Sequence, residues 1–196
     1  MTARAVARLL PPGAEVSGSI SFRGVQVSSL KGQAMRSYRG DVAMIFQDPR
    51  AHVNPVRTIG DFMTEALRTN QDVSKAEAVR RAVALLGEVG IADGERRLGQ
   101  YPHELSGGLL QRVMIATSLL TEPSLLLADE PTTALDVTTQ AEVMAILDDL
   151  RRERGMAMLF ITHDLELAAA TCDRTAVMCA GSVVEVQGSD ALHHAP

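Results

Sequence analysis

The stretch Leu125-Leu126-Leu127-Ala128-Asp129-Glu130-Pro131 places two adjacent carboxylates directly after a short apolar run. An apolar run without polar alternation is typical of a strand that is buried on both faces, as in a parallel sheet. Functional side chains in such sheets lie at the carboxyl ends of the strands. The Asp can hold Mg²⁺, usually through water, and the Glu can act on a water as a base. The alternative interpretation is two solvated acidic residues in a turn. An Asp-Glu pair considered without its context favours this alternative.

Apolar runs and helical patterns alternate on both sides of this stretch. The patterns predict strands over 42–46, 124–128, 156–161, 175–178 and 182–186, and helices over 137–154 and 165–171. Strands that alternate with helices indicate a parallel sheet covered on both faces. We therefore expect an α/β fold with a mostly parallel sheet flanked by helices.

Two other parts of the chain have a different pattern. From about 61 to 120 the apolar spacing is helical, and Ser74 followed by Glu77 predicts a capping box. The segment 2–10 has helical composition and stops at Pro11-Pro12-Gly13, and 16–22 reads as weakly extended. The middle block is the predicted subdomain.

Three further sites carry residues suited to phosphate or metal chemistry. Ser106-Gly107-Gly108 opens a helix predicted to start at Leu109, where free N–H groups and a hydroxyl suit an anion. His163 follows a buried strand and could contact a phosphate oxygen. Gln47 follows the strand 42–46 and could reach a metal or a water. An ordinary Ser cap, a helix-entry His with Asp164 as the cap, and a surface amide are the alternatives.

Composition excludes several classes of function. Lys and Arg number 19 and Asp and Glu 24, so the net charge is 19 − 24 = −5, which argues against a nucleic-acid binder. Aromatic residues make up 3% of the chain and Trp is absent, so base-stacking platforms are not expected. The sequence contains no run of about 18 apolar residues, the length that a membrane-spanning helix needs, so no membrane span is expected. Cys172 and Cys179 are interpreted as packing residues in a reducing compartment.

In their order along the chain, these segments resemble the ATPase domain of ABC transporters. The resemblance covers essentially the whole chain and is closest to importers of dipeptides, oligopeptides and nickel, with sugar and polar amino-acid importers as the next candidates. The matching motifs are the Q-loop at 46–49, the signature LSGGLLQ at 105–111, Walker B at 125–130, the D-loop at 134–136 and the switch histidine His163. The stretches IFQDP, Asn54-Pro55, Thr58-Ile59-Gly60, YPHELSGG and ADEPTTALDVT carry the closer likeness.

The resemblance implies an ATP-hydrolysing subunit with ATP and Mg²⁺ as cofactors. It implies a P-loop NTPase-like catalytic core over 1–60 and 116–196, with an inserted helical signature subdomain over 61–115. The implied site has catalytic Glu130 and His163, metal-binding Asp129 and Gln47, and nucleotide-binding Gln47, Ser106, Gly107, Gly108 and Asp136. The signature residues would serve the nucleotide of a second subunit.

The same resemblance implies the partners and the location. The expected partners are transmembrane permease subunits, a second ABC ATPase subunit in a homo- or heterodimer and, indirectly, an extracytoplasmic solute-binding protein, but no nucleic acid. The expected location is peripheral, on the cytoplasmic face of the plasma (inner) membrane. The solute is not specified by the sequence.

One element of the family is missing from the printed sequence. A P-loop, G-x-x-x-x-G-K-[ST], should come first, and the chain has none. Residues 1–10 resemble the helix that follows a P-loop, the first strands and the adenine-stacking aromatic are also absent, and relatives continue past Pro196. Because every downstream motif is intact, we expect a start further upstream or a fragment, rather than a degenerate remnant. A non-catalytic subunit that donates only its signature face is the alternative.

Overall fold

The computed structural model describes residues 1–71, 73–133 and 135–189. The chain divides into two units, residues 1–159 and residues 160–196. The first unit contains Gln47, the segment 106–108, Asp129 and Glu130, and the second contains His163. The candidate site residues predicted from the sequence therefore lie in two different units of the structure.

Parallel pairing defines the sheet of the first unit. The strands β3 (Val42–Ile45) and β4 (Leu125–Asp129) lie in the first unit, and β5 (Ala157–Ile161), next in the sheet order β3-β4-β5, begins in the first unit and ends in the second. Strands β3 and β4 run parallel, and their register pairs Ile45 with Ala128. Leu126, Leu127 and Ala128 are completely buried, so β4 is the strand covered on both faces that its apolar run predicts.

The first part of the unit is more irregular than its composition predicts. Helix α1 spans Thr2–Val6 and ends before Arg8, whose φ is +54°, so the helix expected over 2–10 is shorter. The extended run over 16–22 is reduced to β1 (Ser21–Phe22), which pairs antiparallel with β2 (Val25–Gln26). The short helix η1 (Val27–Ser29) and helix α2 (Gly32–Asp41) lead into β3.

Two polar side chains bind this first part together. The hydroxyl of Tyr38, on α2, donates to the carbonyl of Val6 at 2.6 Å. The Arg8 guanidinium donates to the carbonyls of Val27, at 3.2 Å, and Leu30, at 3.0 Å. These bonds satisfy carbonyls that α1 and η1 leave without a helical partner.

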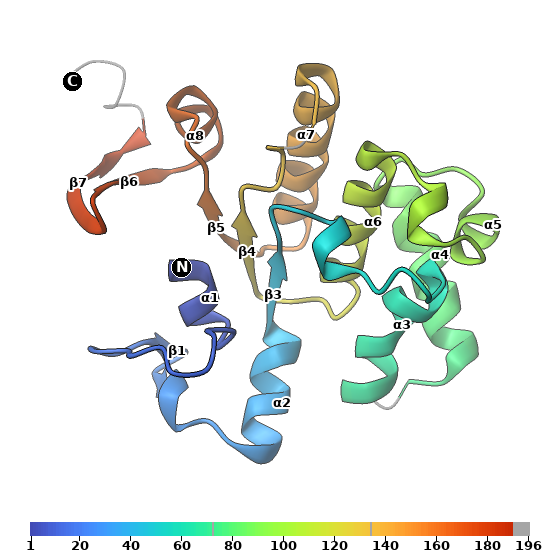
Figure 1. Cartoon of the computed structure of the whole chain (residues 1–196), viewed down its shortest axis with the longest axis horizontal. Helices are drawn as coiled ribbons and strands as arrows, with labels where there is room; N and C mark the ends of the chain where they lie inside the picture. The colour runs from blue at the N-terminus through green and yellow to red at the C-terminus, as the bar shows by residue number, and fades with distance from the viewer. Residues whose placement is uncertain (72, 134, 190–196) are drawn as a thin grey trace. The chain divides into compact units, whose positions relative to one another are not determined.

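Four helices form the predicted helical block, coloured green in Figure 1. They are α3 (Ile59–Asn70), α4 (Lys75–Glu88), α5 (Gly94–Leu98) and α6 (Gly107–Leu119), joined in part through the short helix η3 (Pro102–Glu104). Ser74 caps α4 by accepting the Glu77 N–H at 3.3 Å. The predicted capping box is only half formed, because the Glu77 carboxylate pairs with Arg80 and Arg81 instead.

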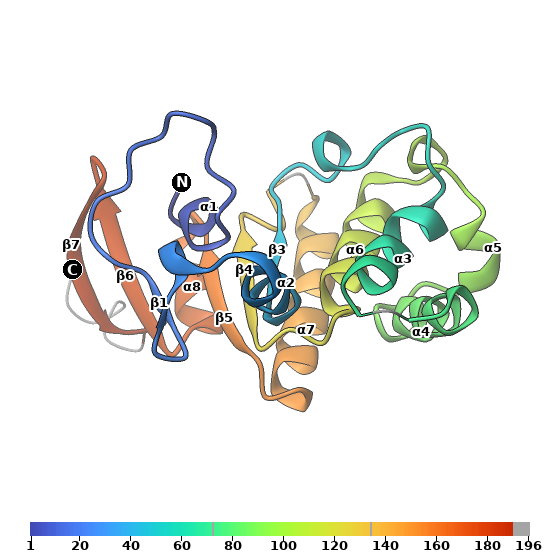
Figure 2. The ribbon, with the colours of Figure 1, turned by 90° about the horizontal axis from the view of Figure 1, so that it is seen from below.

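Helix α7 (Val137–Glu153) follows β4 in the first unit (Figure 2). The second unit contains α8 (Leu165–Thr171) and the antiparallel strands β6 (Arg174–Cys179) and β7 (Ser182–Gly188). Ala180 and Gly181 both have positive φ, the geometry of a tight hairpin turn. The last two predicted strands therefore form a hairpin of their own. Within the described residues, no helix has the length and apolar composition needed to cross a bilayer.

The packing of α3 against α5 generates a matched stability prediction. A Cβ at Gly60 would lie 2.9 Å from the Leu98 carbonyl oxygen, whereas a Cβ at Gly87, near the end of α4, would meet no atom within 4 Å. Gly60→Ala should lower the free energy of unfolding by about 1–3 kcal/mol because backbone must shift. Gly87→Ala should raise it by about 0.5–1 kcal/mol through helix propensity. Urea unfolding measures the change in the free energy of unfolding for both variants. Changes of the same sign would contradict the close packing of Gly60 against Leu98.

Candidate functional site

The turn after β4 brings Glu130 into a strained conformation. Glu130 has a φ of +49°, in the left-handed region, which costs a residue with a Cβ about 1–3 kcal/mol. The next two residues, Pro131 and Thr132, are buried. Strained backbone next to a carboxylate at a strand end is a recurrent feature of functional sites.

The Glu130 carboxylate accepts hydrogen bonds from Gln47 and Thr133. The Gln47 amide donates from Nε2 to Glu130 Oε2 at 2.9 Å, and the Thr133 hydroxyl donates to the same oxygen at 2.8 Å. Gln47 follows β3 and Glu130 follows β4, so the parallel pairing of these strands brings the two side chains to one edge of the sheet. These two bonds orient the carboxylate.

Asp129 and Gln47 have the chemistry of a Mg²⁺ site. Asp129 is the last residue of β4 and is half-buried. Because Gln47 Nε2 donates to Glu130, its amide oxygen is the atom suited to a cation. No cluster of three or more His, Cys, Asp or Glu able to hold a metal occurs within residues 1–71, 73–133 and 135–189. These residues fit a Mg²⁺ that takes its other ligands from water and substrate phosphates.

The signature segment begins helix α6 two residues earlier than its sequence pattern predicts. The helix starts at Gly107, and the Ser106 hydroxyl caps it by accepting the Leu109 N–H at 3.3 Å. A Cβ at Gly107 would meet no atom within 4 Å, but one at Gly108 would lie 3.0 Å from Thr139 Cγ2. Gly107 therefore leaves the helix start accessible, whereas Gly108 allows α6 to approach α7 closely.

The D-loop prediction is only partly covered by the structure. Ala134 lies outside the described residues, and Asp136 is the N-cap of α7. Its Oδ1 accepts the Thr139 N–H at 3.0 Å, and its Oδ2 accepts the Thr139 hydroxyl at 2.7 Å. The bond from the Thr139 backbone, followed by that from its hydroxyl, lowers the pKa of the Asp136 carboxyl.

His163 is exposed at the start of the second unit. Its neighbour Asp164 caps α8 by accepting the Leu167 N–H at 3.0 Å, and the Asp164 N–H donates to the Thr162 hydroxyl at 3.0 Å. The cap that the sequence suggests for Asp164 is present, and His163 lies in the tight turn before it.

The loop after Gln47 contributes a residue that the sequence did not indicate. Arg50, in the short helix η2 (Arg50–His52), donates from Nη2 to the Leu105 carbonyl at 3.3 Å, next to the signature segment. The loop itself is closed by the Asp48 carboxylate, which accepts the Arg50 N–H, and by stacking of His52 on Phe46. The sequence shows that an Arg follows Asp48-Pro49. That pattern does not predict that the Arg side chain binds a carbonyl 55 residues away.

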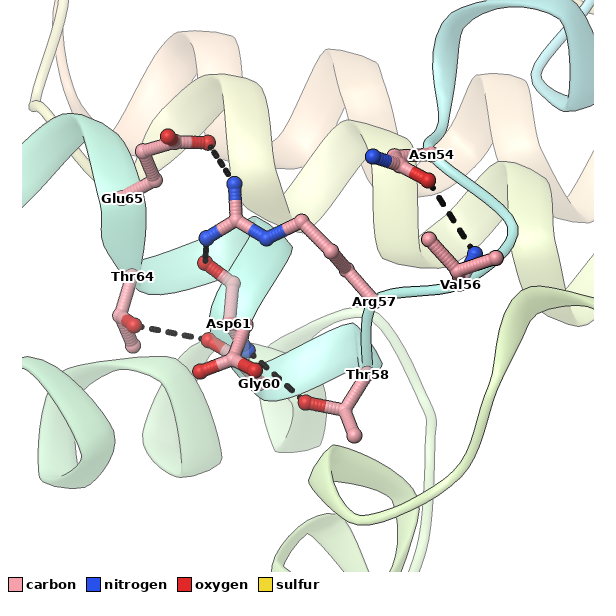
Figure 3. Close-up of polar contacts among 8 residues, drawn as sticks. All are labelled: Asn54, Val56, Arg57, Thr58, Gly60, Asp61, Thr64 and Glu65. Atoms are coloured by element: carbon pink, nitrogen blue, oxygen red, sulfur yellow. Dashed lines mark hydrogen bonds and ion pairs between the residues drawn. The ribbon is translucent and has the colours of Figure 1, made fainter.

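Beyond this loop, polar contacts organise the start of α3 (Figure 3). The Thr58 hydroxyl caps the helix through the Asp61 N–H at 3.2 Å, and Arg57 pairs with Glu65 at 2.7 Å. Val56 is held by a bond from its N–H to the Asn54 side chain, yet 78% of Val56 is exposed. The segment is therefore a hydrogen-bonded part of the surface that exposes an apolar side chain, that of Val56.

The lowered pKa of Asp136 predicts how stability depends on pH. A folded pKa below the unfolded value means that the cap stabilises the protein above the unfolded pKa of about 3.9, and that this is lost as the pH falls through the folded pKa. Asp136→Ala should lower the urea midpoint at pH 7, and its deficit should shrink in acid. Asp136→Asn, which caps without titrating, should keep most of the midpoint. A deficit for Asp136→Ala that stays constant with pH would contradict the assignment.

Comparisons with known proteins agree with this geometry. The family described as ABC transporter matches residues 1–133. The "Probable peptide ABC transporter ATP-binding protein y4tR" of Sinorhizobium fredii is 49% identical over 188 residues, or 94% of this chain and 56% of that protein. The "Oligopeptide transport ATP-binding protein OppD" of Bacillus subtilis is 44% identical over 199 residues, or 100% of this chain and 56% of that protein. The chain thus spans little more than half the length of these relatives.

Solved structures share the fold. The structure of cbiO1 from Clostridium perfringens, part of the ABC transporter complex cbiONQ, superposes with a TM-score of 0.79 at 26% identity and covers 98% of this chain and 73% of that one. The ATP-binding cassette MJ0796, in a dimeric post-hydrolysis state bound to ADP and Pi, superposes with a TM-score of 0.77 at 25% identity, covering 96% and 79%. With a family match that spans more than half of its residues, the chain belongs to the ABC transporter family.

Proposed function

We propose that this chain is the nucleotide-binding part of an ATPase that powers the import of peptides or related solutes. The observation that carries the proposal is the contact between Gln47 and Glu130, which fixes a carboxylate at the end of β4. The names of relatives such as the oligopeptide transport protein of Bacillus subtilis support the substrate class.

In this proposal, Glu130 is the group that acts on the attacking water. Its carboxylate accepts a proton from the water or holds the water in line, while the bonds from Gln47 and Thr133 keep Oε2 in place. His163 is proposed to contact a phosphate oxygen of ATP. Asp129 and the Gln47 amide oxygen hold Mg²⁺, which neutralises charge on the phosphates when it is bound.

The signature segment serves the nucleotide of a second ATPase subunit. Ser106, Gly107 and Gly108 offer a hydroxyl and the first N–H groups of α6 to phosphate oxygens, and Asp136 lies at the start of the neighbouring helix α7. The proposed division is a catalytic core over 1–60 and 116–196 with the signature subdomain over 61–115. The remaining partners are transmembrane permease subunits and, indirectly, an extracytoplasmic solute-binding protein. The chain itself is peripheral, at the cytoplasmic face of the plasma (inner) membrane.

Glu130→Gln tests the catalytic assignment. In a fusion that places the P-loop region of a relative ahead of Met1, the variant should keep ATP affinity and lose hydrolysis by about 10²–10⁴-fold, because an amide cannot accept the proton. Glu122→Gln is the matched control, because Glu122 also has a positive φ, of +54°, in an exposed loop. Steady-state assays measure the rate of ATP hydrolysis, and nucleotide titration measures the affinity for ATP. Normal turnover in Glu130→Gln would remove Glu130 from this role.

Ser106→Arg tests the role of the signature in the dimer. Bulk at the start of α6 should exclude the partner's phosphate and prevent ATP-dependent dimerisation, while nucleotide still binds to the chain's own half-site. Ser74→Arg is the control, since Ser74 also caps a helix by accepting the N–H three residues on, at the same 3.3 Å. Sedimentation with Mg-ATP, in the Glu130→Gln background, reports the dimer. A dimer that forms equally well with Ser106→Arg would show that Ser106 does not face the partner's nucleotide.

A further inference from the structure

Helix α6 contains a buried amide that the site described above does not use. Gln111 is the last residue of the signature motif at 105–111, four residues into helix α6, and is only 2% exposed, among apolar neighbours along the helix such as Leu110 and Ile115. A buried amide is costly unless its polar atoms are hydrogen-bonded. An apolar residue would fill this position at lower cost, so the amide calls for an explanation in terms of its partner.

The partner of Gln111 is the turn that carries Glu130. Gln111 Nε2 donates to the carbonyl of Pro131 at 2.5 Å, across 20 residues of sequence, and the bond is buried. Pro131 directly follows Glu130, whose backbone is strained at a φ of +49°. A strained residue stays in its conformation only where the surrounding structure holds it there.

The Glu130 turn is thus held from two sides. On the surface, Gln47 and Thr133 bind the carboxylate oxygen. In the interior, Gln111 binds the backbone one residue further on. The two surface bonds orient the side chain, whereas the bond from Gln111 links the main chain of the turn to α6.

We propose that Gln111 is a positioning residue for hydrolysis: by binding the Pro131 carbonyl, it holds the backbone of Glu130 in register with helix α6. The inference rests on the proposed function, because it concerns the geometry of the carboxylate that acts on water. It gives α6 a second role beside the phosphate contacts at its start. Loss of the bond lets the turn relax and moves the carboxylate away from the reacting water.

The control for this inference is Thr64→Val. Thr64 is also 2% exposed, and its hydroxyl donates to a backbone carbonyl, that of Gly60, at 2.7 Å. Thr64→Val therefore removes a partly buried side chain-to-backbone bond from helix α3, away from the Glu130 turn. Gln111→Met removes the amide while keeping the length of the side chain.

The first measurement is amide hydrogen exchange on the chain itself. The Leu135 N–H donates to the Thr132 carbonyl at 3.0 Å, within the turn. In Gln111→Met its exchange should accelerate on the order of ten-fold more than that of Gln140, on α7, because one bond that closes the turn is lost. Thr64→Val should leave the ratio of the two rates as in the wild type. An unchanged ratio in Gln111→Met would overturn the inference without reference to ATP.

The second measurement uses the fusion with a P-loop region. Gln111→Met should lower kcat on the order of 10-fold to 100-fold with KM for ATP unchanged, since misplacing a reacting group acts on the chemical step. Combined with Glu130→Gln it should cause no further loss, because Gln111 acts through Glu130. Thr64→Val should retain the wild-type kcat. A loss in Gln111→Met that adds fully to that of Glu130→Gln would overturn the inference.

The two proposals fail in different ways. If the fusion does not hydrolyse ATP, the proposed function fails, while hydrogen exchange still reports whether Gln111 holds the turn. If the fusion hydrolyses ATP and Gln111→Met matches Thr64→Val, the inference alone fails. Should Gln111→Met not fold, Gln111→Asn keeps an amide in the same surroundings but is one methylene too short, and the same loss of kcat is expected; a wild-type kcat in that variant would overturn the inference.

Discussion

The parallel pairing of β3 with β4 is the constraint on which the site depends. The register aligns Ile45 with Ala128, so Gln47 and Glu130 each lie two residues beyond the same aligned pair. Their side chains meet at 2.9 Å although 83 residues separate them in the sequence. A shift of one residue in either strand would turn its side chains to the other face and separate the amide from the carboxylate. The apolar residues of β4, buried on both faces, prevent such a shift.

The strain at Glu130 is tolerated because the turn around it is tied down at several points. Thr133 and Leu135 donate N–H groups back to the carbonyls of Glu130 and Thr132, at 3.4 and 3.0 Å. Pro131 needs no partner for a backbone N–H, because it has none, and its carbonyl binds Gln111. The carbonyls of Glu130, Pro131 and Thr132 therefore all accept hydrogen bonds, which help to hold the strained dihedral in place.

Local sequence patterns predicted the helices and strands. Contacts between residues far apart in the sequence determined where some of them end and which side chains pair. The apolar run before Asp129 and Glu130 predicted β4, and Asp164 was a foreseeable cap for α8. Helix α1 is shorter than its composition suggests because Arg8 adopts a left-handed backbone to bind η1. The capping box at Ser74 is incomplete because Arg80 and Arg81 compete for the Glu77 carboxylate. The partner of Gln111 depends on tertiary packing, which hydrophobic periodicity does not encode.

The two interpretations of the signature segment, a helix cap and an anion site, are compatible in physical terms. The Ser106 hydroxyl accepts the Leu109 N–H, and a hydroxyl that accepts one bond still has a proton to donate. A helix start presents four N–H groups without a partner inside the helix, so the cap leaves the N–H groups of the first residues, Gly107 and Gly108, directed toward the helix start. Gly107 adds no side chain there, and nothing lies within 4 Å of where its Cβ would be. The cap therefore holds the helix start in a form that can still bind an oxygen ligand, and the Ser and the first Gly perform distinct parts of that task.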